Sequence, residues 1–187
     1  MHGGCLSISN RRVNIRDSIF TGCYAKSSGG AITVSGSSHL EIYDTQFINN
    51  KATTEGEDCD KIEESSGVIG GGAISGSSPT QECPGGFANI KNTILKIGEK
   101  SLFQSCSSYC GKGGSLYLKN VQSTIGGLST FKDSTARSGG AIFASKSSTT
   151  IVDSKFDNNH ATSANGGALE ILGTSTEVTG CTFQNNK

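Results

Sequence analysis

Residues 139–161 read GGAIFASKSSTTIVDSKFDNNHA, and the order of residue types in this stretch returns along the whole chain. A Gly-Gly pair is followed by a small residue and an aliphatic residue, and a lone Phe comes later. Self-similarity at a fixed spacing is the signature of a repeat architecture. The six units open at Gly3-Gly4, Gly29-Gly30, Gly71-Gly72, Gly113-Gly114, Gly139-Gly140 and Gly166-Gly167, and their Phe residues are Phe20, Phe47, Phe103, Phe131, Phe156 and Phe183.

The spacing between successive Gly-Gly pairs is 26, 42, 42, 26 and 27 residues. A period of 26–27 residues therefore runs through the chain, with insertions near residues 51–70 and 77–91. We expect residues 1–187 to form one domain that is a segment of a longer solenoid, because solenoid ends need polar caps and none is visible. The predicted coils are about 3–28, 29–70, 71–112, 113–138, 139–165 and 166–187.

Apolar residues alternate over short runs in the units, as in Leu6-x-Ile8, Ile32-x-Val34 and Leu116-x-Leu118. A period of two indicates strands. The residues between the runs are Ser, Gly, Asn, Thr and Asp, which favour turns and disfavour helix interiors. Three short strands per unit at nearly constant length predict an all-β fold, the right-handed parallel β-helix, with about six coils.

In such a fold, equivalent side chains of successive coils stack about 4.8 Å apart. We therefore expect the six Phe residues to form an internal stack, with a second inward column of small residues two positions before each Phe. An Asn three positions after Phe is expected to bond along the axis and to turn backbone. The Gly-Gly pairs suit a tight corner where positive φ or close backbone packing excludes a Cβ.

Composition excludes two classes of partner. The chain contains 16 Lys and Arg and 16 Asp and Glu, so its formal net charge is zero, and no basic stripe with interleaved aromatic residues supports nucleic-acid binding. No apolar run approaches the length of a membrane span, so direct membrane insertion of this segment is not expected.

The seven Cys residues favour an oxidising, extracellular setting with one or two disulfides. Cys59 and Cys83 lie in the two insertions and form the best candidate pair, and Cys106 and Cys110 are spaced to close a small loop. The residues expected to be buried free thiols are Cys5, Cys23 and Cys181.

No cofactor, metal or catalytic residue is predicted. The spacing of Cys106 and Cys110 lacks a nearby His or a second pair for zinc. The acidic cluster between Glu55 and Glu64 lacks the alternating spacing of a calcium loop. Thr residues are too scattered for the regular rows of an ice-binding face.

A polysaccharide-degrading enzyme is one alternative function, since it would use carboxylates clustered on adjacent coils. Asp17, Asp44 and Asp153 share the position three residues before Phe. The column is interrupted in the other units, so Asp at a turn is the better interpretation and the chain is not expected to be an enzyme. The interrupting residues are Lys100, Leu128 and Gly180.

The motifs GGA-[IL] and F-x-x-N together resemble those of the polymorphic membrane proteins of chlamydiae, large surface autotransporters whose passenger domains are β-helices. The resemblance implies an adhesin segment on the cell surface, held at the bacterial outer membrane by its parent protein, that attaches to a host-cell protein or glycan. Complete motifs are Gly29, Gly30, Ala31 and Ile32 with Phe47 and Asn50; Gly139, Gly140, Ala141 and Ile142 with Phe156 and Asn159; and Gly166, Gly167, Ala168 and Leu169 with Phe183 and Asn186.

Two further hypotheses remain open at this stage. A structural spacer of a large surface protein would use the same repeated core, and in that case changes in the 51–70 and 77–91 insertions would be silent. Self-association is a further partner that the sequence leaves open. If the motif residues matter for adhesion, we expect them to act by building the coil, because Phe at an inward strand position is core.

Overall fold

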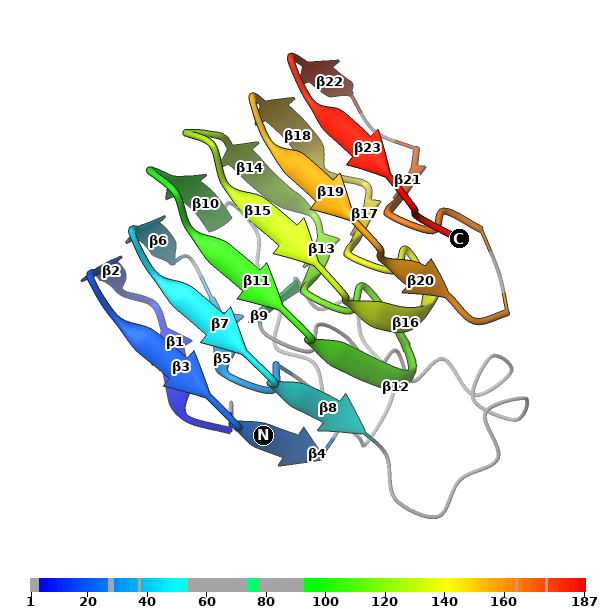
Figure 1. The fold of residues 1–187 in the computed structure, drawn as a ribbon. Helices are drawn as coiled ribbons and strands as arrows, with labels where there is room; N and C mark the ends of the chain where they lie inside the picture. Colours follow the sequence, from blue (N-terminus) through cyan, green and yellow to red (C-terminus); the bar gives the residue numbers. More distant parts are fainter. Residues whose placement is uncertain are drawn as a thin grey trace.

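The computed structural model describes residues 4–26, 29–36, 38–53, 74–77, 93–163, 165–173 and 175–187. Nearly all of the two insertions, with Cys59 and Cys83, lies outside the described residues. In the described part, every regular element is a β-strand. The strands stack in six coils that run from the N-terminus at one end to the C-terminus at the other (Figure 1).

Four parallel sheets run along the stack, and each is named here by a letter. Sheet A contains β1 (Leu6–Ser9), β5 (Ile32–Ser35), β9 (Ile74–Ser77), β13 (Leu116–Lys119), β17 (Ile142–Ser145) and β21 (Leu169–Leu172). Sheet B contains β2 (Arg12–Arg16), β6 (His39–Tyr43), β10 (Thr93–Gly98), β14 (Val121–Ile125), β18 (Ser148–Val152) and β22 (Thr176–Thr179).

Sheets C and D complete the circuit of each coil. Sheet C contains β3 (Ile19–Thr21), β7 (Gln46–Ile48), β11 (Leu102–Gln104), β15 (Thr130–Lys132), β19 (Lys155–Asp157) and β23 (Thr182–Gln184). Sheet D contains β4 (Tyr24–Lys26), β8 (Lys51–Thr53), β12 (Ser107–Lys112), β16 (Thr135–Ser138) and β20 (His160–Ala161).

The expected parallel β-solenoid is confirmed, because every paired strand is parallel to its equivalent in the next coil. Register follows the repeat: Phe103 pairs with Phe47 on one side and with Phe131 on the other. The expectation of three strands per coil is wrong, since coils 1 to 5 each have four. The additional strand, in sheet D, follows the F-x-x-N motif directly. It is not evident in the sequence, because three of the five sheet D strands have only two or three residues and an inward Ala or Ser marks each strand.

Four corners join the strands of a coil, and they explain much of the turn chemistry. Each corner that the described residues form has a residue of positive φ, a conformation in which Gly, Asn and Asp cost least among ordinary residues. One corner is the third residue of F-x-x-N in every coil. These residues are Gly22, Asn49, Ser105, Asp133, Asn158 and Asn185.

The six Phe residues form the predicted internal stack. Neighbouring ring centroids are 4.7–5.0 Å apart, and the ring planes differ by 5–8°. The four central rings are fully buried among aliphatic side chains from sheets A and B. Small polar residues two positions before Phe form the second inward column, whose hydroxyls donate to corner carbonyls, as Thr45 does to Tyr43 at 2.7 Å. Burial of both columns closes the core without a large hydrophobic fraction in the sequence.

Candidate functional site

The repeat-motif residues lie inside the coils. Ala31, Ile32, Phe47 and Asn50 of the second coil have no exposed surface, and the same holds for Ala141, Ile142, Phe156 and Asn159 of the fifth. Ala168 of the last coil is 6% exposed, whereas Phe183 is 46% exposed. An intact inner coil therefore does not present either motif to a partner.

The Asn of F-x-x-N clamps its coil to the preceding one. Asn50 Oδ1 accepts from the Cys23 amide at 2.9 Å, and its Nδ2 donates to the Phe20 carbonyl at 3.0 Å. Asn159 repeats both bonds with Ser134 and Phe131, and its Nδ2 also donates to Asn186 at 3.0 Å. A short side chain with one acceptor and two donors is what this position requires. The motif thus has a structural role that its buried geometry explains.

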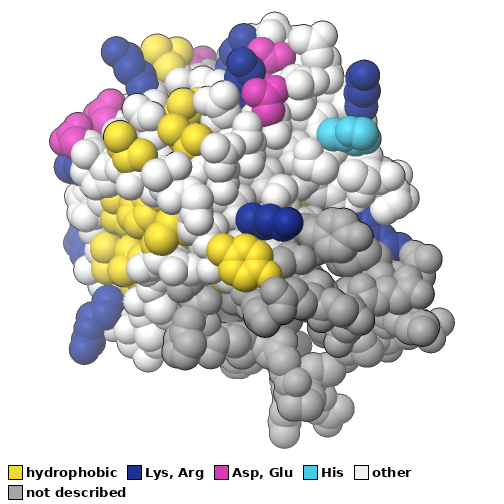
Figure 2. All heavy atoms as spheres, turned by 60° about the horizontal axis from the view of Figure 1, so that its bottom comes forward, with side chains coloured by type: hydrophobic (Ala, Val, Ile, Leu, Met, Phe, Trp, Pro, Cys, Tyr) yellow, Lys and Arg dark blue, Asp and Glu magenta, His cyan; other side chains and the backbone are white. Residues whose placement is uncertain are grey.

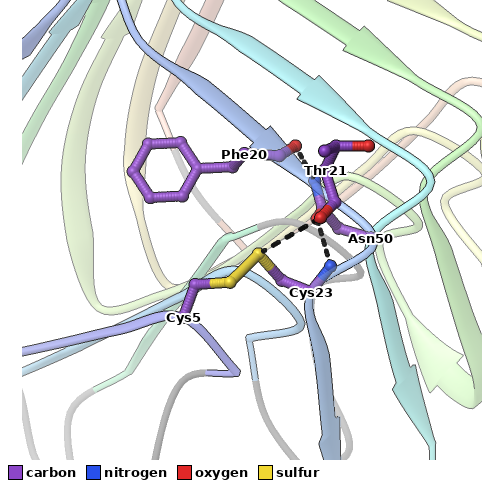
Figure 3. The surroundings of a disulfide bond; sticks show 5 residues. All are labelled: Cys5, Phe20, Thr21, Cys23 and Asn50. Atoms are coloured by element: carbon purple, nitrogen blue, oxygen red, sulfur yellow. Dashed lines mark hydrogen bonds between the residues drawn. A yellow bond between two sulfur atoms is a disulfide. The ribbon is translucent and has the colours of Figure 1, made fainter.

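The Ala position of GGA lies just before the sheet A strand and the Asn position of F-x-x-N just before the sheet D strand, and coil 1 shows that the two positions are adjacent within one coil. Cys5 stands at the first position and Cys23 at the second, and a disulfide joins them with a Cα–Cα distance of 5.7 Å (Figure 3). In coil 4 the same positions hold Ser115 and Ser134, whose hydroxyl oxygens are hydrogen-bonded at 2.8 Å. The two departures from the motif in each of these coils therefore compensate for each other.

The cysteine predictions need correction. Cys5 and Cys23 are bonded and are not free thiols. The suggested Cys106–Cys110 pair is wrong, because Cys106 is a free thiol buried in the core, 3.4 Å from the Phe47 carbonyl. Cys106 occupies the Asn position of F-x-x-N in coil 3. Its thiol replaces only one of the two hydrogen bonds that Asn makes to the preceding coil. Cys181 is a free thiol, as expected, but it is only partly buried.

Cys106 is not a reactive centre in the folded chain. Burial raises the pKa of its thiol to about 12, although hydrogen bonds with Asn50, Ser115 and Gln104 act in the opposite direction. Since the thiolate is the nucleophilic form of Cys, this residue stays protonated and inert near neutral pH.

A second disulfide can be tested between the corresponding two positions of coil 4. Ser115→Cys with Ser134→Cys, made together with Cys106→Ala to remove the neighbouring thiol, is expected to form it on oxidation. A bridge closing a loop of about 20 residues should raise the free energy of unfolding by about 3 kcal/mol. Urea denaturation of oxidised protein measures the gain against the Cys106→Ala parent.

The matched control is the single change Ser134→Cys in the same parent, which offers no partner thiol. Peptide mapping without reduction should recover the new Cys pair from the double variant alone. Free thiols at both positions 115 and 134 of the oxidised double variant would show that these positions are not placed as the two Cys residues of coil 1 are.

The carboxylate column three residues before Phe is a turn position. All six of its residues have positive φ whatever their side chain, so the position is defined by its turn conformation, and only three of the six residues are Asp. Among the described residues, no group of three His, Cys, Asp or Glu side chains is arranged to hold a metal ion. The column consists of Asp17, Asp44, Lys100, Leu128, Asp153 and Gly180.

Charged and aromatic side chains lie together on the outer surface of sheet B. Strand alternation turns nine residues of β2, β6 and β10 outward, and we call this set the sheet B face of coils 1–3. It carries three cations and one carboxylate, a formal charge of 3 − 1 = +2 with neutral histidine. The nine residues are Arg12, Asn14, Arg16, His39, Glu41, Tyr43, Ile94, Lys96 and Gly98.

Glu41 is at the centre of this face. Its carboxylate faces His39 Nε2 at 2.9 Å, Asn14 Nδ2 at 3.3 Å and the Arg12 guanidinium at 3.5 Å. The hydrogen bond from His39 is the main cause that lowers the pKa of Glu41, with smaller contributions from nearby cations. The carboxylate therefore stays charged and orients two of its neighbours.

Tyr43 separates the two cations on the other side of the face. The Arg16 guanidinium carbon is 4.2 Å from the ring centroid, and the Lys96 ammonium is 5.6 Å from it. The hydrogen bond with Tyr43 raises the pKa of Lys96. Because the Tyr43 ring is only 7% exposed, it is a support for these cations rather than an open platform.

A second outward pair of aromatic rings lies on sheet A. Tyr117 and Phe143 are stacked with centroids 5.4 Å apart, and the Lys112 ammonium is 4.7 Å from the Phe143 centroid. Glu170 follows Phe143 in the same register, and burial raises the pKa of its carboxyl. Both rings are nearly inaccessible, at 1% and 4% exposed, so they do not form a docking surface.

Charge elsewhere is dispersed. On the face that Figure 2 shows, Lys and Arg side chains and Asp and Glu side chains lie as separate groups among uncharged atoms, without a broad field of one sign. Within the described ranges, no helix is long and apolar enough to cross a membrane.

Comparisons with known proteins add no relative. No family model matches the chain, and no curated protein or solved structure matches it either.

Proposed function

We propose that the chain is a surface-displayed adhesin passenger segment of the polymorphic-membrane-protein type, which attaches to a host-cell surface protein or glycan outside the cell. The resemblance of the motif pair suggests the class. One structural observation supports a recognition role. The residues of the repeat motifs are buried inside the coils, whereas the outward residues differ from coil to coil. On sheet B four of the nine outward residues of coils 1–3 are charged, whereas the outward residues of coils 4–6 are mostly Ser, Thr and Gln.

The disulfide of coil 1 supports an extracellular location. Cys5–Cys23 fastens the first coil at the position where other coils use Asn, and such bonds persist in oxidising compartments. A display scaffold outside the cell gains from a bond that does not depend on the coil-to-coil hydrogen bonds.

Binding of the labelled chain to cultured epithelial cells tests this proposal. Two variants accompany it: one with the insertions trimmed within residues 54–70 and 78–91, which leaves β8 and β9 whole, and one with Arg12, Arg16 and Lys96 all changed to Ala. We expect saturable binding that at least one variant loses. No saturable binding by the parent chain, with its circular dichroism showing folded β-structure, would leave the structural spacer as the better function.

A further inference from the structure

We propose that the sheet B face of coils 1–3 binds an acidic polysaccharide, with Arg12, Arg16 and Lys96 as its anion contacts. This inference deepens the proposed function by naming a partner class and a face. It begins from the contrast along one sheet. Coils 1–3 have four charged residues among nine outward positions, whereas in coils 4–6 the described outward positions of sheet B include one, Glu177.

The cations of this face are available to a ligand. Arg12 is 74% exposed and Arg16 is 52% exposed, and their ion pairs with Glu41 and Glu99 are long, at 3.5 and 3.9 Å. Exposed ion pairs of this kind contribute little, so an anion of higher charge density can compete with them. The guanidinium groups keep donors that fit carboxylate or sulfate groups in two-point contacts.

Two of the contacts are also preorganised. The Arg16 guanidinium carbon lies 4.2 Å from the centroid of the Tyr43 ring, and the Lys96 ammonium lies 5.6 Å from the same centroid. Gly98 leaves room for this ring, since a Cβ there would lie 3.3 Å from two of its carbons. A cation held against a buried ring loses less rotamer freedom on binding, which favours affinity.

The spacing of these contacts fits a linear polymer. Coils are about 4.8 Å apart along the axis, so the strands that carry the cations of coil 1 and of coil 3 are separated by about 9.6 Å in that direction. A polymer with repeated acidic groups can contact both sets as it lies along the stack. The outward side chains of coils 4 and 5 would then meet sugar hydroxyls. They include Gln122, Thr124, Ser148 and Thr150.

An acidic peptide fits this face less well. Peptides that add to a sheet need a free strand edge. Strands β6 and β10 are paired on both sides, so coils 2 and 3 offer side chains and no backbone groups, and among the strands of this face only β2 is paired on one side alone. The polar, flat surface of a parallel sheet suits a chain of hydroxyls and acids better than one of apolar anchors.

Binding of the full chain to immobilised heparin and to hyaluronan, with dextran and polyglutamate as comparisons, tests the inference. The variant with Arg12, Arg16 and Lys96 changed to Ala should lose about ten-fold in affinity for at least one acidic polysaccharide, as expected when three screened surface contacts disappear together. Its matched control changes three exposed lysines of sheets C and D to Ala, which removes the same charge. These lysines are Lys51, Lys132 and Lys155.

A further variant, Glu41→Gln, distinguishes ligand binding by this face from a purely structural role of its residues. It removes the one carboxylate of the face, so we expect tighter polysaccharide binding, even though the lost contacts with His39 and Arg12 slightly lower stability. Equal loss in both triple variants, no binding to either acidic polysaccharide, or tighter binding to polyglutamate would overturn the inference. Cell binding that survives such a result would leave the adhesin proposal standing with another face.

Discussion

Changing Gly140 to Ala is expected to prevent coils 5 and 6 from closing on each other. A Cβ on this residue would collide with the Gly167 carbonyl oxygen and would lie 2.6 Å from the His160 amide nitrogen and 2.7 Å from its carbonyl carbon. All of these atoms are backbone, in β20 of the same coil or in coil 6, so no side-chain rotation relieves the contact. We expect a loss of more than about 4 kcal/mol in the free energy of unfolding, which is exceptional for one methyl group.

Gly173→Ala is the matched control. Gly173 has a φ of +60°, but a Cβ there would meet nothing within 4 Å. The substitution therefore costs only the left-handed backbone strain, about 1–2 kcal/mol. Urea denaturation followed by circular dichroism compares the two variants. Similar losses in both would show that the contacts of this Cβ are relieved and that close packing between coils does not explain the repeated Gly-Gly pattern of this chain.

The repeat itself was readable from the sequence because solenoid coils place equivalent residues in one environment. The register of the Phe stack, the small second column and the exclusion of a Cβ at the Gly-Gly corner all follow from that rule. Sheet D was not predicted, since strands of two or three residues such as β20 have too few positions to show alternation. Their existence depends on pairing along the axis rather than on local propensity.

The disulfide was missed although the sequence contained its signal. Cys5 and Cys23 replace the Ala of GGA and the Asn of F-x-x-N in one unit, and Ser115 and Ser134 replace them in another. Joint departures within a unit indicate that two positions touch. Stacking along the axis relates equivalent positions of different coils, so it does not reveal a contact between two positions of the same coil.

The repeat does not predict the side chains of the outer surface. Outward side chains do not pack in the core, so the residue types at these positions do not repeat from coil to coil. The contacts of Glu41 and of Tyr43 depend on which residues happen to be neighbours in successive coils, which only the register of β2, β6 and β10 defines. Functional differences between such solenoids are therefore expected in these columns.

Asn159→Ala is expected to lower the free energy of unfolding by at least about 3 kcal/mol. The residue is completely buried, and its side chain satisfies the Ser134 amide and the Phe131 carbonyl at 3.1 Å each. Ala leaves both groups without these partners in the core, and each unsatisfied group costs about 1–3 kcal/mol. The bond with Asn186 is lost as well, so the effect should extend into the last coil. Thermal and urea denaturation measure the change.

The neighbouring amide provides the control that separates the buried clamp from the corner. Asn158 is exposed, has a φ of 53°, and donates to Asp133 Oδ1 at 2.8 Å. Asn158→Gly keeps the left-handed backbone and removes only this surface hydrogen bond, so we expect a loss below about 1 kcal/mol. If the two substitutions destabilise equally, the Asn of F-x-x-N does not clamp successive coils. If they differ as expected, any effect of the motif on adhesion in this chain must first be corrected for unfolding, because altering the motif destroys the surface that carries the outward columns.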